Sequence, residues 1–343
     1  MTGLAWAIAI PAHNEADRID DCLAAIGRQR GVALADGAVV VLADNCTDET
    51  AQIARQSRVG CRLHVIDAGL GSAGAARCAA MTHARGLVRD DGSLLTTDAD
   101  AIADDDWIAA MLGCFSDDRI DLVAGRVSGN WEEMKDHPQA ALDIGALECR
   151  FGDLTVALED AIDPQPFDPA PRHGQECGAN IGIRAAMFDR VGGVPAIAVG
   201  EDRALIEAVF ACDGGIRHAW APHVTASARV DGRAEGGMAT ALRQRIEGTY
   251  LCDELVMPAV VLERRLALRH AARTAHAKGE FSRWAAGNGV HRMTADACFG
   301  SNWLRFLAHC QHLAASQVPP ADLPREIAKL ERMIAQRTDR HVA

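Results

Sequence analysis

The chain has 343 residues, of which 49% are hydrophobic and 24% are charged, and its formal net charge at pH 7 is −12. This length favours two domains, or one large α/β unit with an appendage. Acidic side chains outnumber basic ones by 47 to 35, which argues against the basic footprint of a nucleic-acid-binding protein. The sequence contains no run of about 18 apolar residues, so it predicts no transmembrane segment. The amino terminus lacks the basic start of a signal peptide. Eleven scattered cysteines without C-x-x-C pairs are typical of reduced thiols, so we expect a soluble cytoplasmic protein.

The first half of the chain alternates short apolar runs with helical patterns. The apolar runs predict strands at 4–10, 38–42, 63–66, 93–97 and 122–124. Apolar residues at helical spacing predict intervening helices that begin near Ile19, Thr47, Gly74 and Trp107. This alternation predicts an α/β fold with a mostly parallel sheet flanked by helices. Because ligands bind at the carboxyl ends of such strands, the polar residues there are the functional candidates.

The second half of the chain is mostly helical. A helical pattern at 130–160 ends in a proline-rich loop at 163–171. A G-A-N triplet at 178–180 follows, and G-E-D-R at 200–203 opens a further helix. Beyond residue 248 the pattern is helical, and it includes a basic stripe, Arg264, Arg265, Arg269, Arg273 and Lys278. Such a stripe is either a solvated helix face or a contact for a membrane surface or an acidic acceptor.

Two acidic motifs are candidates for catalysis. Asp98-Ala-Asp100 follows a buried strand, so both carboxylates point into one crevice. Oxygen ligands of this kind hold Mg²⁺ or Mn²⁺ together with substrate phosphates, although an acidic helix cap is the alternative. Glu201-Asp202 opens a helix, where it is either a cap or a general base for an incoming hydroxyl. His223 lies near a strand edge as a further candidate metal ligand, although a structural role is the commoner one for a single histidine.

A glycine-rich turn supports a competing interpretation. Gly69-Leu-Gly-Ser-Ala-Gly74 matches G-x-G-x-x-G between a strand and a helix, as in dinucleotide-binding proteins. Two βα units precede it, whereas such motifs usually begin the fold. The alternative function is therefore an NAD(P)-dependent oxidoreductase, and the simpler interpretation is a tight turn at a helix start.

The order of these motifs is more specific than any one of them. The series resembles the family 2 glycosyltransferases, which have the GT-A fold; it comprises Ile10-Pro-Ala-His-Asn-Glu15, Leu42-Ala-Asp-Asn-Cys-Thr-Asp48, the turn 71–77, Thr97-Asp-Ala-Asp-Ala101, Gly178-Ala-Asn180, Val191-Gly-Gly193 and Gly200-Glu-Asp202. The resemblance covers about residues 4–248. It implies a GT-A-type, Rossmann-like catalytic domain at 1–248, followed by a helical C-terminal extension at 249–343.

The resemblance also implies a role for each matching residue. The nucleotide pocket would be lined by Pro11, Ala12, Asn14 and Glu15. Asp44 would accept a hydrogen bond from the base, and Arg77 would lie near the nucleotide. Asp98 and Asp100 would hold the metal, Mn²⁺ or Mg²⁺, on the diphosphate, with Asp100 the better ligand. Asp202 would be the catalytic base, with Glu201 as its neighbour.

The implied activity is that of a glycosyltransferase of the hexosyltransferase class. It would move one sugar from a UDP-linked donor to a hydroxyl of a soluble or peripherally held acceptor, with inversion at C1. The Q-x-x-R-W motif of processive synthases is absent, since Arg243-Gln-Arg245 lacks the tryptophan, which favours single transfer. The extension is a candidate acceptor lid, homodimer interface or peripheral membrane contact.

Two further alternatives complete the set. A sugar-nucleotide pyrophosphorylase has a similar fold, but it carries a basic, glycine-rich loop after the first strand, where this chain has the acidic Pro11-Ala-His-Asn-Glu15. A non-catalytic binding module would not require acids at all three site positions.

Overall fold

The computed structural model describes residues 3–233, 236–291, 293–294, 296–313 and 317–342. The chain divides into two compact units, which are described separately. The first unit comprises Met1–Asp136, Gln175–Val209 and Gly214–Arg243, and the second comprises His137–Gly174, Phe210–Asp213 and Gln244–Ala343. The second unit thus includes the 137–174 segment as well as the tail. The predicted functional domains, 1–248 and 249–343, stay a prediction.

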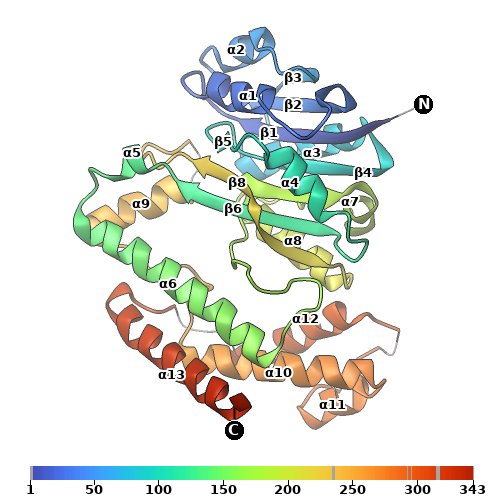
Figure 1. The fold of residues 1–343 in the computed structure, drawn as a ribbon, viewed down its shortest axis with the longest axis vertical. Helices are drawn as coiled ribbons and strands as arrows, with labels where there is room; N and C mark the ends of the chain where they lie inside the picture. The colour runs from blue at the N-terminus through green and yellow to red at the C-terminus, as the bar shows by residue number, and fades with distance from the viewer. Residues whose placement is uncertain (1–2, 234–235, 292, 295, 314–316, 343) are drawn as a thin grey trace. The chain divides into compact units, whose positions relative to one another are not determined.

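The first unit is built on an 8-stranded sheet with the order β3-β2-β1-β4-β7-β6-β8-β5 (Figure 1). The strands are β1 (Leu4–Ala12), β2 (Gly37–Asp44), β3 (Arg62–Ala68), β4 (Val88–Thr96), β5 (Ile102–Ala103), β6 (Leu122–Gly129), β7 (Ile181–Arg184) and β8 (Ile216–Ala226). β1 pairs in parallel with β2 and β4, β2 with β3, and β6 with β8. β7 is antiparallel to β4 and β6, and β5 to β8. The α/β, mostly parallel architecture is confirmed.

Helices cover both faces of this sheet. The helical elements with residues in this unit are α1 (Ile19–Gly27), η1 (Leu34–Asp36), α2 (Thr50–Gln56), α3 (Ala73–Arg85), α4 (Trp107–Cys114), α5 (Trp131–Met134), η2 (Gly178–Asn180), α7 (Ala185–Val191), α8 (Glu201–Ala211) and α9 (Met238–Glu247), the last two crossing unit boundaries. Alternate residues of β1, such as Ile8 and Ile10, pack against α1, α2 and α4 in the main apolar core. α3 packs on β1, β2 and β4. Because every residue of β2 is buried, its apolar run is continuous rather than alternating.

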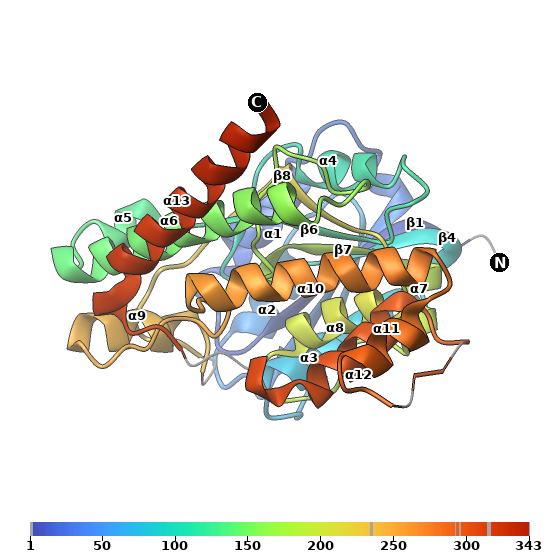
Figure 2. The same ribbon diagram turned by 90° about the horizontal axis from the view of Figure 1, so that it is seen from below.

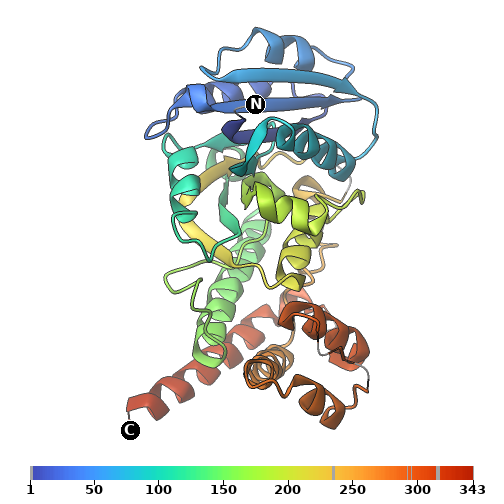
Figure 3. The same cartoon turned by 90° about the vertical axis from the view of Figure 1, so that its right-hand side faces the viewer.

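The second unit is helical. Its elements are α6 (Gln139–Ile162), α10 (Ala259–Ala277), α11 (Phe281–Gly287), α12 (Phe299–His309), η3 (Gln311–Leu313), η4 (Pro320–Asp322) and α13 (Leu323–Val342). α10 packs against α11 and α12 (Figure 2), and α13 packs against α6 (Figure 3). One apolar cluster joins α6, α10 and α13, and a second, aromatic one joins α10, α11 and α12. Among the described residues, no helix combines the length and the apolar character that crossing a bilayer requires.

The basic stripe of α10 is engaged in ion pairs within this unit. Arg269 pairs with Glu159 and Asp163, and Arg273 also pairs with Asp163. Arg172, which directly follows the proline-rich loop, pairs with Glu159 at 2.6 Å. Asp163 is only 1% exposed. The stripe is therefore not simply a solvated face, because two of its arginines form ion pairs with acidic residues at the end of α6, Glu159 and the adjoining Asp163.

We expect this network to make the stability of the chain sensitive to acid. Burial alone would raise the pKa of Glu159, but Arg269 and Arg172 lower it to about 2. Since the pKa is below its unfolded value, the stabilisation is present above about pH 4.5 and is lost as the pH falls toward 2. It amounts to at most about 3 kcal/mol. Urea unfolding at pH 6, 4 and 3 should show this loss in the wild type and a smaller one in Glu159→Gln.

The matched control for the acid experiment is Glu331→Gln. Glu331 pairs with Arg150, but both side chains are about half exposed, so this pair contributes little. The control should retain the wild-type dependence on pH. An identical acid dependence in Glu159→Gln would contradict the expectation.

Candidate functional site

The loop after β1 is fixed to the loop after β2. The Asn14 side chain accepts a hydrogen bond from the Thr47 amide at 2.8 Å, and the Glu15 amide donates to the Thr50 hydroxyl at 2.7 Å. Asn14 has a positive φ of 54°, which asparagine tolerates better than most residues. Pro11 and Ala12 end β1 itself. The residues predicted to line a nucleotide pocket thus lie at the carboxyl edge of the sheet.

Asp44 and the glycine-rich turn bind each other. The Asp44 carboxylate accepts hydrogen bonds from the Leu70 amide at 2.5 Å and from the Gly71 amide at 3.0 Å. Gly71 has a φ of +82°. At Gly74, a Cβ atom would lie 1.9 Å from the carbonyl oxygen of Ile197. The turn therefore serves a protein carboxylate and close packing, which does not favour a dinucleotide phosphate site.

Arg77 of α3 connects the two acidic motifs. Its Nη2 donates to Asp98 at 2.8 Å and its Nε donates to Glu201 at 2.8 Å. Nη1 donates to the Thr96 hydroxyl and to the Gly178 carbonyl oxygen. Burial alone would lower the pKa of Arg77, but Asp98 and Glu201 raise it above its ordinary value. This guanidinium is buried among protein groups and fixes the position of both carboxylates.

We expect replacement of Arg77 by Met to destabilise the chain strongly. Glu201 is 8% exposed, so the substitution would leave its carboxylate buried without a counter-charge. Breaking a buried pair in this way costs about 3–5 kcal/mol. The free energy of unfolding in urea measures the loss. Arg119→Met removes an arginine whose pair with Asp117 is exposed and should leave stability unchanged; equal losses in both variants would contradict the prediction.

Asp100, Glu15 and Arg229 form the second part of the site. Arg229, in the segment after β8, makes a two-pronged pair with Glu15 and lies 3.2 Å from Asp100. Burial, followed by the charges of Asp98 and Glu15, raises the pKa of Asp100 to about 7, although Arg229 acts in the opposite direction. The carboxylates therefore outweigh the positive charge around them. Oxygen ligands with an excess of negative charge fit a hard divalent cation.

A divalent cation at Asp100 would need ligands from the substrate as well. Within the described ranges, no group of three His, Cys, Asp or Glu side chains is suited to hold a metal ion. The ring nitrogens of His223 lie 3.0 Å from the Asp104 carboxylate and 3.0 Å from the Ser128 hydroxyl. These contacts occupy both nitrogens. The role of His223 as a ligand stays a prediction that this geometry does not support.

Asp202 lies beside the G-A-N triplet. Its Oδ2 accepts a hydrogen bond from the Gly178 amide at 2.8 Å, and the Gly178 carbonyl oxygen accepts from Arg77. A Cβ atom on Gly178 would lie 2.8 Å from the Arg77 guanidinium, so a larger residue here would displace that guanidinium. Asn180 is buried and donates to the carbonyl oxygens of Arg126 and Pro222. The triplet thus binds Asp202 through Gly178 and binds the backbones of β6 and β8 through Asn180.

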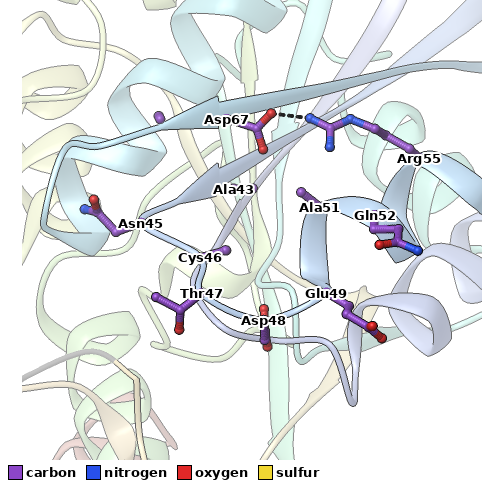
Figure 4. A pocket seen from close by; sticks show the side chains of 11 residues that line it. Ala43, Asn45, Cys46, Thr47, Asp48, Glu49, Ala51, Gln52, Arg55 and Asp67 are labelled. Atoms are coloured by element: carbon purple, nitrogen blue, oxygen red, sulfur yellow. Dashed lines mark hydrogen bonds and ion pairs between the residues drawn. The ribbon is translucent and has the colours of Figure 1, made fainter.

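Two hollows lie near these residues. The larger, of about 410 Å³, lies beside the carboxyl ends of β2 and β3 and is lined by Ala43, Asn45, Cys46, Thr47, Asp48, Glu49, Ala51, Gln52, Arg55, Asp67 and Ala68 (Figure 4). Figure 4 shows Arg55 paired with Asp67 at its rim. It contains none of the predicted site residues. The smaller hollow, of about 120 Å³, is lined in part by Asp100 and Arg18.

The structure thus brings together four of the predicted residues, Arg77, Asp98, Glu201 and Asp202. Arg77 links Asp98 with Glu201, and Gly178 links Arg77 with Asp202. Arg229 was not predicted, because the sequence around it has no recognisable pattern. Glu133 of α5 was also missed: it accepts from the Ser227 hydroxyl and the Ala228 amide and pairs with Arg18.

Comparison with known proteins agrees with the family resemblance found in the sequence. A family model described as "Glycosyl transferase family 2" matches residues 7–158. No curated protein matches the sequence significantly. Residues 1–349 of S. aureus TarS, crystallised with UDP, are 13% identical with a TM-score of 0.50; the match covers 99% of this chain and 92% of that chain.

Two further structures resemble the chain. The mannosyltransferase PcManGT from Pyrobaculum calidifontis, in complex with GDP-Man and Mn²⁺, is 16% identical with a TM-score of 0.49, over 98% of this chain and 84% of that chain. A longer structure of S. aureus TarS is 14% identical with a TM-score of 0.46, over 72% of this chain, which spans 43% of its length. The TarS 1–349 likeness and the matched segment together support the resemblance in the sequence: the chain has the fold of the GT-A glycosyltransferases, and its residues 7–158 match the model of family 2.

Proposed function

We propose that the chain transfers a single sugar from a nucleoside-diphosphate donor, UDP-linked, to a hydroxyl of a soluble or peripherally held acceptor. The observation that carries this proposal is the joining of Asp98 to Glu201 through the guanidinium of Arg77. This contact holds the D-x-D motif and the helix start that carries Asp202 around one site. UDP is the first nucleotide to test because it is bound in the TarS structure of the same fold.

Asp98 and Asp100 would hold a divalent cation, Mn²⁺ or Mg²⁺, against the donor diphosphate. Such a cation neutralises the charge that develops on the leaving phosphates. Arg77 is a positioning residue in this proposal, because its contacts are with Asp98, Glu201, Thr96 and Gly178. Pro11, Ala12, Asn14 and Glu15 would border the nucleotide. Asp44 would have to share or exchange its bonds with the 69–71 turn to accept one from the base.

Asp202 would act as the general base. Its Oδ2 is held by the Gly178 amide, which fixes the carboxylate while it takes the proton of the acceptor hydroxyl. The acceptor oxygen would form a bond to C1 as the bond from C1 to the diphosphate breaks. Attack from the face opposite the leaving group inverts the configuration at C1, which is the outcome we propose.

Residues 249–343 would supply none of the donor-binding or catalytic residues proposed above. The site residues named above all belong to the first unit, whereas the tail belongs to the second. An acceptor lid, a homodimer interface and a peripheral membrane contact are the three roles we retain for it.

Thermal unfolding with UDP, GDP, CDP, dTDP, NAD or NADP, each with and without Mn²⁺, tests the proposal. A ligand that binds only the folded chain stabilises it by about 2.7 kcal/mol at a hundred times its Kd. We expect one nucleoside diphosphate to raise the melting temperature, and to do so only with Mn²⁺. A shift with NAD or NADP that is indifferent to metal would overturn the proposal in favour of an oxidoreductase.

A further inference from the structure

The carboxylate that we propose as the main metal ligand already has a cationic partner in the protein. Arg229 Nη2 lies 3.2 Å from Asp100 Oδ2 and also contacts Glu15. The Arg229 side chain is 15% exposed and that of Asp100 is 21% exposed, so the contact is partly shielded from water. Burial alone would lower the pKa of Arg229, but Glu15 and Asp100 raise it, so the guanidinium stays charged. A positive charge therefore stands where a divalent cation would be attracted.

Arg229 has a second carboxylate partner, so it would remain paired if it left Asp100. Arg229 binds Glu15 through both Nη atoms, whereas a single, longer contact joins it to Asp100. The backbone beneath it is held separately, because Glu133 accepts hydrogen bonds from the Ser227 hydroxyl and the Ala228 amide. A movement of the Arg229 side chain would therefore free Asp100 without requiring the backbone of the segment to move.

Space for a hydrated ion lies beside the same carboxylate. Asp100 lines a hollow of about 120 Å³ together with Asn130, Thr225 and Ser227, which carry further oxygen atoms. A divalent cation of the Mg²⁺ type keeps several of its waters when it binds. The cation and the guanidinium would carry like charges within a few ångströms of one carboxylate, so they cannot both occupy it without repulsion.

We propose that Arg229 is an internal counter-cation which competes with the divalent metal for Asp100. Arg229 pairs with both Glu15 and Asp100, and metal would bind to Asp100 when the guanidinium keeps only Glu15 as its partner. The proposal rests on the metal site given under Proposed function. It predicts that the intrinsic metal affinity of the chain is lower than its carboxylates alone would give.

The test is the affinity of the full chain for Mn²⁺ alone, without nucleotide, measured from the electron paramagnetic resonance of the free ion. Arg229→Met removes the competing charge, and we expect its Kd for Mn²⁺ to fall about two- to fivefold, since ion pairs of this kind contribute up to about that factor. Arg119→Met removes the same charge from an exposed pair with Asp117 and should leave the Kd unchanged. An unchanged or higher Kd in Arg229→Met would overturn the proposal.

Two additional variants keep the outcomes distinct. Arg229→Met leaves Glu15 unpaired and could fail to fold for that reason. The second comparison is therefore between Glu15→Gln and the double variant Glu15→Gln/Arg229→Met. The Kd for Mn²⁺ should be lower in the double variant than in Glu15→Gln, by the same factor as above. Asp100→Asn tests the underlying site. If Asp100→Asn loses Mn²⁺ binding and Arg229→Met does not gain, the competition is wrong and the metal site stands. If Asp100→Asn binds Mn²⁺ as the wild type does, the metal site and the competition both fail.

Discussion

Replacing Asp100 with Asn should reduce sugar transfer at least about a thousandfold. A cation on the leaving phosphates contributes several kcal/mol to the transition state, and each 1.36 kcal/mol corresponds to about a factor of ten in rate. The amide of Asn matches the shape of the carboxylate but lacks its charge, so the variant should fold. The decisive measurement is the initial rate of nucleotide release from the donor at saturating Mn²⁺, beside a thermal melting curve.

The matched control for Asp100→Asn is Asp104→Asn. Asp104 follows the same motif, but its carboxylate is about half exposed and faces His223. It should retain nearly full transfer. If Asp100→Asn were as active as the control, in the presence or absence of metal, the assignment of Asp100 to the diphosphate would be wrong.

Replacing Asp202 with Asn should separate donor binding from transfer. A positioned general base contributes a factor of about 10²–10⁴, so we expect kcat to fall by that amount. The affinity for the nucleotide should change less than about threefold, because the proposed nucleotide and metal contacts lie on other residues. Steady-state kinetics give kcat, and calorimetric titration with the nucleoside diphosphate and Mn²⁺ gives the affinity.

Glu207→Gln is the control on the same helix, since Glu207 is exposed on α8. It should behave as the wild type in both measurements. A variant Asp202→Asn that loses nucleotide affinity together with kcat would point to a binding role for Asp202 instead of a catalytic one.

The fold of the first unit was predictable where the sequence has a regular pattern. The apolar run at 38–42 lies within β2, whose side chains are buried throughout, and the helix expected from Trp107 spans Trp107–Cys114. β5 and β7 were missed, because strands of 2 and 4 residues are too short for a period to be read. The helix expected at Thr47 begins at Thr50 instead, because the Asp48 side chain accepts hydrogen bonds from the Thr50 amide and hydroxyl.

The candidate site was predictable only as far as acids at strand ends. Asp98 and Asp100 follow β4, so the direction of one strand already places them at the carboxyl edge of the sheet. Arg77 was expected near the nucleotide, but the structure buries it between Asp98 and Glu201. That pairing joins residues 124 positions apart, and Arg229 meets Glu15 across 214 positions. Partners so distant depend on tertiary packing, which no local pattern in the sequence reports.

The position of Arg77 has a consequence for how mutational energies in this chain can be interpreted. One guanidinium contacts Asp98, Glu201 and the carbonyl oxygen of Gly178, whose own amide holds Asp202. Residues that share a partner are not energetically independent. A loss measured after changing Asp98 therefore includes the rearrangement of Arg77 toward its remaining partners. Contributions of the acids cannot be summed from single variants, and only double-mutant cycles that include Arg77 would apportion them.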